Sequence, residues 1–251
     1  MPSRTRLFLN AEAILYIVIL INMQRAFLPL PVSPLLCLAS IFLCCLYALS
    51  WLLESDIFHE GCFFLNAALL FSLCADYFLI FTDFYIAGIL LFCLAQLSYF
   101  LLLKRRISSA LRYAFLFLLP VFIINVFYPL SIDAELLLSL IYVSLLSGNI
   151  RSAFKKNSPW MAMGLILLLL CDLHVGIFNL ADYIPALASA LSGWIENSTF
   201  LIWMFYIPAQ VSLSLMSSSA SIKNFKKVKS GAGGSDDLLP GKPEDTITRA
   251  F

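Results

Sequence analysis

Long apolar runs follow one another along most of this chain, and they constrain its fold more than any other feature. Each run has roughly 20 residues, the length of α-helix that crosses the hydrocarbon core of a bilayer. Because backbone groups in lipid must find partners within the protein, unbroken runs of this length indicate helices. The predicted spans are Leu7–Met23, Val32–Leu53, Gly61–Ile80, Phe84–Leu103, Ser108–Phe127, Ala134–Phe154, Trp160–Leu180 and Thr199–Met216.

The composition supports the same class. Of the 251 residues, 61% are apolar and 12% are charged, whereas soluble domains are about 45–50% apolar and about 25% charged. We therefore predict an all-α polytopic membrane bundle of about eight transmembrane helices in residues 1–216. The remaining residues, 217–251, are rich in Ser, Gly, Lys and Asp. Such a segment has too few apolar groups to offset its ordering entropy, so we expect a disordered cytoplasmic tail.

The positions of the basic residues predict the orientation. If the N-terminus is cytoplasmic, only Arg25 of the 16 Lys and Arg residues lies on the outer side. Cytoplasmic loops of membrane proteins carry an excess of Lys and Arg, so this arrangement is the favoured one. We expect a multi-pass protein with both termini cytoplasmic, in the endoplasmic reticulum membrane if the source is eukaryotic.

Two acidic residues within the predicted spans stand out, Asp76 and Asp172. An ionisable group at bilayer depth costs about 2.5–3.5 kcal/mol on insertion scales, so each one indicates a function. Asp76 lies 15 residues after the start of its span (76 − 61), and Asp172 lies 12 after the start of its span (172 − 160). Both spans run outward, so the two carboxyls are expected at similar depths, where one cavity could hold both.

Other polar residues recur at helical spacing near this depth. Ser72 precedes Asp76 by one turn, and Tyr206 precedes Gln210 by one turn. Because residues four apart share a face, these pairs predict polar stripes facing a common cavity. In each half of the chain an aspartate helix is followed by a glutamine helix, which indicates two related four-helix halves. The longer stripes are Gly88, Phe92, Gln96 and Tyr99, and Gly164, Leu168, Cys171 and Asp172.

Several functions are compatible with these stripes. Intramembrane polar groups can simply hydrogen-bond across helices and fix the packing. An acid pair also suits a proton-coupled transporter. An intramembrane aspartyl protease is disfavoured because neither aspartate has a GxGD signature around it. The chain contains two histidines and no metal-type spacing, so no metal is expected.

The same stripes resemble the YhhN family, also called the transmembrane protein 86 family. The resemblance extends over about Leu7 to Met216, and it rests on four motifs. These are residues 72–79 (SLCADYFL), Gly88-xxx-Phe92-xxx-Gln96-xx-Tyr99, Gly164-xxx-Leu168-xx-Cys171-Asp172 and Tyr206-xxx-Gln210.

Four positions depart from the family pattern. Gln96 stands where histidine is usual, Ala75 where glycine is usual, Cys171 where serine is common and Leu168 where an aromatic residue is common. Both aspartates are kept. An amide cannot carry a proton, so a role of the family histidine in proton transfer does not extend to Gln96.

The resemblance implies a lysoplasmalogenase, which hydrolyses the vinyl ether bond of a lysoplasmalogen to a fatty aldehyde and a glycerophospho-base. Asp76 and Asp172 would then be the catalytic pair, since burial favours the neutral form of a carboxyl and lets it act as an acid. The expected partners are a lysophospholipid substrate and membrane lipids, with no nucleic acid and no cofactor. A lipid-binding or lipid-sensing member without activity is the alternative that Gln96 favours. The expected substrate-binding residues are Ser72, Gln96, Tyr99, Tyr206 and Gln210.

Overall fold

The computed structural model describes residues 2–29, 32–54, 60–103, 119, 133–183 and 191–232. Within these ranges the structure is helical and contains no strand. The elements are α1 (Ser3–Arg25), α2 (Val32–Glu54), α3 (Glu60–Phe81), α4 (Tyr85–Leu102), α6 (Ala134–Lys155), α7 (Pro159–Tyr183), α9 (Ser192–Glu196) and α10 (Ser198–Ala232).

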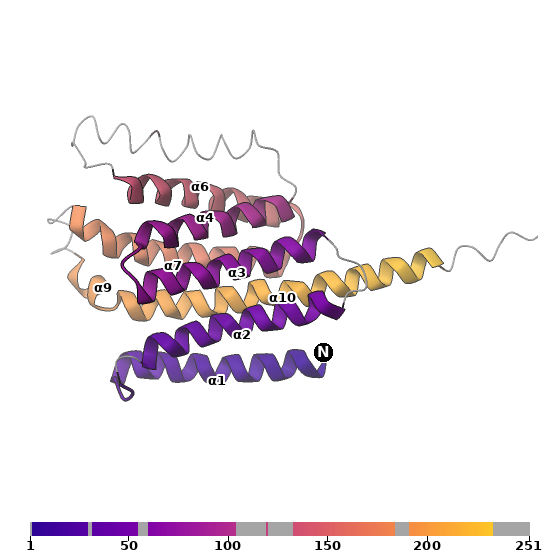
Figure 1. Cartoon of the computed structure of the whole chain (residues 1–251), viewed down its shortest axis with the longest axis horizontal. Coiled ribbons are helices and arrows are strands. Elements are labelled where there is room, and N and C mark those ends of the chain that lie inside the picture. Colours follow the sequence, from indigo (N-terminus) through magenta and orange to yellow (C-terminus); the bar gives the residue numbers. More distant parts are fainter. Residues whose placement is uncertain are drawn as a thin grey trace, which may run out of the picture.

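Seven of these helices are long and apolar enough to cross a membrane, which confirms a polytopic helical bundle. Their membrane-spanning parts match seven of the eight predicted spans to within a few residues at each end. The predicted span Ser108–Phe127 lies outside the described residues, apart from residue 119. The helices lie side by side with their long axes nearly aligned (Figure 1).

The contacts between α4 and α6 define their relative direction. Phe92 of α4 packs against Tyr142 of α6, and Gln96 bonds to Asn149, so residue numbers rise together along both helices. The two helices are therefore parallel, as an eight-span topology requires. The N-terminus lies at the end of the bundle where α10 leaves it (Figure 1).

Helix α10 contains a proline, and its cost is offset by α1. Pro208 has no N–H, so the carbonyl of Met204 one turn earlier loses its helical donor. The hydroxyl of Tyr16 donates to this carbonyl over 2.9 Å. Because an unpaired carbonyl is costly in lipid, this bond ties α1 to α10 at a defined height.

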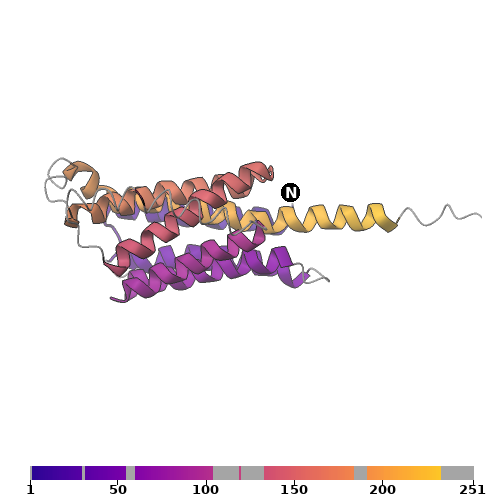
Figure 2. The ribbon, with the colours of Figure 1, turned by 90° about the horizontal axis from the view of Figure 1, so that it is seen from above.

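Helix α10 also continues past the predicted end of the membrane domain. It runs to Ala232, so residues 217–232 are helical where the sequence predicted a disordered tail from residue 217. Extending a formed helix avoids the cost of nucleation, which explains how this polar stretch stays helical beyond the span. Figure 2 shows α10 running beyond the other helices. The predicted tail after Ala232 lies outside the described residues.

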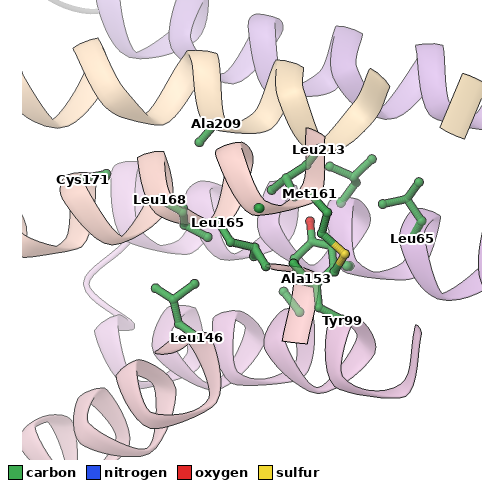
Figure 3. Packing of buried hydrophobic residues seen from close by; sticks show 14 of the residues in the cluster. Leu65, Tyr99, Leu146, Ala153, Met161, Leu165, Leu168, Cys171, Ala209 and Leu213 are labelled. Carbon is green, nitrogen blue, oxygen red and sulfur yellow. The ribbon is translucent and has the colours of Figure 1, made fainter. Parts of the chain in front are cut away.

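Apolar side chains of six of the described helices, α2, α3, α4, α6, α7 and α10, fill the centre of the bundle. Leu65, Leu146, Leu165 and Leu213 are almost fully buried there, and Tyr99 lies among them (Figure 3). Large apolar side chains such as Leu7, Leu53 and Leu70 are exposed on the outside. An apolar exterior around a packed interior is the pattern expected of a bundle surrounded by lipid.

Candidate functional site

Each of the two predicted aspartates receives a hydrogen bond from a tyrosine. The hydroxyl of Tyr206 on α10 donates to Oδ2 of Asp76 on α3 over 2.7 Å. The hydroxyl of Tyr142 on α6 donates to Oδ2 of Asp172 on α7, also over 2.7 Å. Both distances are typical of well-formed O–H···O hydrogen bonds, so each carboxyl group is held in a fixed orientation.

The two aspartate–tyrosine pairs form one site. The ring of Phe92 on α4 packs against Tyr142 and Tyr206, with centroid separations of 5.9 and 6.4 Å. Asp76 and Asp172 are also near enough to interact electrostatically. The structure therefore brings together the two carboxyls that the sequence predicted at a common depth.

Both carboxyl groups lie inside the protein. Asp76 is 5% exposed, and Asp172 is partly exposed as a residue although its carboxyl group is buried. Ser72 is buried on α3 one turn before Asp76, as its spacing predicted. The two carboxyls are thus enclosed by the bundle.

A second polar layer lies along α4 beyond Phe92. The side-chain amide of Asn149 on α6 donates to Oε1 of Gln96 over 3.0 Å and to the Gln96 backbone carbonyl over 2.9 Å. Gln96 is fully buried, and its Nε2 has no hydrogen-bond partner. Asn149 therefore orients Gln96 through both its side-chain oxygen and its backbone carbonyl.

Two further predicted residues also carry unpartnered polar atoms. Gln210 is fully buried with neither Oε1 nor Nε2 bonded, and the Tyr99 hydroxyl is buried without a partner. Tyr99 belongs to the central core cluster, against which Cys45 of α2 also packs. Buried polar atoms without partners are uncommon in folded proteins, and they indicate places where water or a polar ligand group binds.

Glycines allow the helices that carry the site to approach closely. A Cβ on Gly88 of α4 would lie 2.6 Å from Leu79 and 3.3 Å from the carbonyl of Ala75, the residue before Asp76. A Cβ on Gly164 of α7 would lie 2.6 Å from Leu213 and 3.1 Å from the carbonyl of Ala209, the residue before Gln210. Small residues of this kind let membrane helices pack backbone to backbone.

Sequence reasoning missed two polar residues of the bundle. Tyr142, the partner of Asp172, lies in an apolar run, where an aromatic residue looks like ordinary core packing. Glu12 on α1 is an intramembrane acid and could have been found by the rule that identified the aspartates. It is buried and accepts hydrogen bonds from Ser40 over 2.6 Å and from Cys44 over 3.5 Å.

The site gathers several groups that can donate or accept a proton. It contains two carboxyls, two tyrosine hydroxyls and free amide groups inside an apolar bundle. Among the described residues, no group of three or more His, Cys, Asp or Glu is placed to hold a metal ion. This chemistry suits acid–base catalysis by the carboxyl pair.

Comparison with known proteins gives one match. The model of the YhhN family matches residues 31–216, which is most of the chain. The match includes Asp76, Asp172, Tyr142, Tyr206 and Phe92, which together are called the acid-pair site below. Helix α1 precedes the matched region. No curated protein and no solved structure matches this chain significantly.

Proposed function

Because the chain belongs to the YhhN family, we propose that it hydrolyses the vinyl ether bond of lysoplasmalogens. The observation that carries the proposal is the pairing of Asp76 and Asp172, each oriented by a tyrosine hydroxyl at 2.7 Å. The products are a fatty aldehyde and a glycerophospho-base.

The reaction needs one proton donor and one activated water. Asp76, enclosed by protein, donates a proton to the alkenyl carbon that is not bonded to oxygen, and an oxocarbenium ion forms. The Asp172 carboxylate, held by the Tyr142 hydroxyl, stabilises this cation and takes a proton from the attacking water. The resulting hemiacetal breaks its bond to the glycerol oxygen as its own hydroxyl proton is transferred to that oxygen, which releases the aldehyde and the glycerol hydroxyl. Transfer of the proton on Asp172 to Asp76 restores the starting pair.

The tyrosines and glutamines act as positioning and binding groups in this scheme. Tyr142 and Tyr206 keep the carboxyl oxygens pointed at the reacting atoms. The free Nε2 of Gln96 and the free amide of Gln210 bind polar atoms of the lipid or the water. Each orphaned donor would gain a hydrogen bond when substrate enters, which favours binding.

The direct test is aldehyde release from a lysoplasmalogen by purified protein in detergent. Wild type should release aldehyde, and Asp76→Asn and Asp172→Asn variants with unchanged thermal unfolding should not. The matched control is Asp83→Asn, which changes an exposed carboxyl in the connector after α3 and should keep full activity. No release by folded wild type would refute the proposal.

A lipid-binding protein without catalysis is the second candidate, since Gln96 replaces the family histidine with a group that carries no proton. It predicts saturable binding of a lysoplasmalogen without aldehyde release. The same preparations distinguish the two candidates, because binding and release are measured separately.

A further inference from the structure

The acid-pair site lies inside the bundle, so a membrane lipid needs a lateral route to reach it. We propose that this route is the seam between α2 and α10, and that α1 is the movable helix that covers it. The inference rests on the proposed function, because it concerns how a lipid substrate reaches Asp76. It assigns a role to a helix outside the region that the family model matches.

The first argument is what lies behind the seam. Cys37 of α2 is near enough to Asp76 for an electrostatic interaction. An apolar groove of about 550 Å³ is lined by residues 35–42 of α2 and 73–78 of α3, which places Cys37 at the height of Asp76. On α10, Trp203 packs edge-on against Tyr206, the hydroxyl partner of Asp76. One layer of side chains therefore separates the seam from the acid.

The second argument is that α1 covers this layer. Ile19 of α1 is fully buried against Cys37 and Ile207, and Trp203 packs on the same cluster. In order from the lipid inward, the elements are α1, then Cys37 and Trp203, then Asp76 with Tyr206. If the C-terminal half of α1, which contains Ile19, moved away, Cys37 and Trp203 would be exposed to lipid.

The third argument is that α1 is the most peripheral of the candidate spans and is attached to the bundle on one side only. It has the smallest buried share of the seven candidate spans, and it lies at one edge of the bundle (Figure 1). Its polar attachments include Tyr16 to the Met204 carbonyl, Glu12 to Ser40, and Thr5 to Tyr47. Hydrogen bonds between membrane helices are individually weak, so a helix held this way can leave and return.

A cross-link between α1 and α2 tests the cover directly. Ile19→Cys places a thiol in the same buried cluster as native Cys37, so oxidation to a disulfide, or a short bis-methanethiosulfonate that forms a disulfide with each thiol, locks α1 over the seam. The readout is the labelling of Asp76 by dicyclohexylcarbodiimide, a lipid-soluble reagent that reacts with protonated carboxyls, followed by peptide mass spectrometry. Labelling is measured in the reduced and in the cross-linked form of the same variant. Any effect of the substitution on folding is therefore present in both measurements.

We expect the locked form to be labelled about tenfold more slowly, because access scales with the open population. Reduction should restore the rate. Ile19→Ser, treated with the same reagents, has no thiol at this position and should show no change. Equal labelling in both forms, or no labelling of Asp76 in either, would overturn the proposal.

A second variant should shift labelling in the opposite direction. Tyr16→Phe removes the hydroxyl that joins α1 to α10, so Asp76 should be labelled severalfold faster. Tyr77→Phe changes an exposed tyrosine on the Asp76 helix and serves as the control. A Tyr16→Phe rate equal to that of wild type would count against the proposal, even if the cysteine variant does not fold.

Aldehyde release measured in parallel separates this inference from the proposed function. Slow labelling and lost release in the locked form support both. Slow labelling in a protein that never releases aldehyde keeps the moving cover and rejects the hydrolase. Unchanged labelling in a protein that does release aldehyde keeps the hydrolase and rejects this route.

Discussion

Removing either tyrosine hydroxyl is the most specific test of the geometry of the site. Tyr142→Phe and Tyr206→Phe each delete one donor to a carboxyl and leave the ring in place. A lost hydrogen bond to such a group costs about 1–3 kcal/mol, and each 1.4 kcal/mol is about a tenfold change in rate. We expect kcat for aldehyde release to fall about tenfold or more in each variant, with Tyr77→Phe unchanged. A hydroxyl-free variant with wild-type kcat would remove that tyrosine from the mechanism.

Gln96 offers a gain-of-function prediction at the same scale. Its side chain lies within hydrogen-bonding range of the Tyr142 hydroxyl that bonds Asp172. An imidazole here can carry a proton, whereas an amide cannot. We expect Gln96→His to increase kcat and Gln96→Ala to decrease it, measured on variants with equal unfolding temperatures. A histidine variant slower than the alanine variant would contradict a proton-carrying role at this position.

The sequence predicted the acids better than it predicted their partners. Asp76 and Asp172 are conspicuous because charge is costly in an apolar run, and spacing from the span ends gave their common depth. Tyr142 could not be distinguished from a packing residue, because its role depends on how α6 lies beside α7 in space. The orientation of the Gln96 amide could not be predicted either, because it depends on the hydrogen bond that Asn149 donates to its Oε1.

At the scale of helices, Gly164 and Gly176 on α7 form a matched pair. A Cβ at Gly164 meets Leu213 at 2.6 Å and the Ala209 carbonyl at 3.1 Å, whereas a Cβ at Gly176 meets nothing within 4 Å. Gly164→Ala should lower the free energy of unfolding by about 1–3 kcal/mol through overpacking. Gly176→Ala should raise it by up to about 1 kcal/mol through helix propensity. Thermal unfolding in detergent checks both, and equal shifts for the two variants would contradict the close α7–α10 contact.

Helix positions were predicted well because hydropathy and length decide them in a membrane. The apolar runs end at polar or proline-bearing connectors, and Asp133 caps α6 by accepting from the Leu136 amide over 2.8 Å. The end of α10 was not predicted, because its polar extension to Ala232 is decided by continuation of a formed helix and not by apolar content. Which helices pack against each other could not be predicted from the sequence, apart from the close approaches that Gly88 and Gly164 allow.

For the whole molecule, the orientation in the membrane decides from which side water reaches the acid pair. The N-terminus and the exit of α10 lie at one end of the bundle (Figure 1). Only Arg25 among the 16 basic residues would face outward if that end is cytoplasmic. Epitope tags at both termini should therefore be digested by protease added to the cytoplasmic face of sealed vesicles. A tag inserted at Thr82–Asp83, between α3 and α4, should be protected until detergent is added. The reverse pattern would place the acid pair in the cytoplasmic half of the bilayer, because Asp76 lies nearer to this connector than to the start of α3.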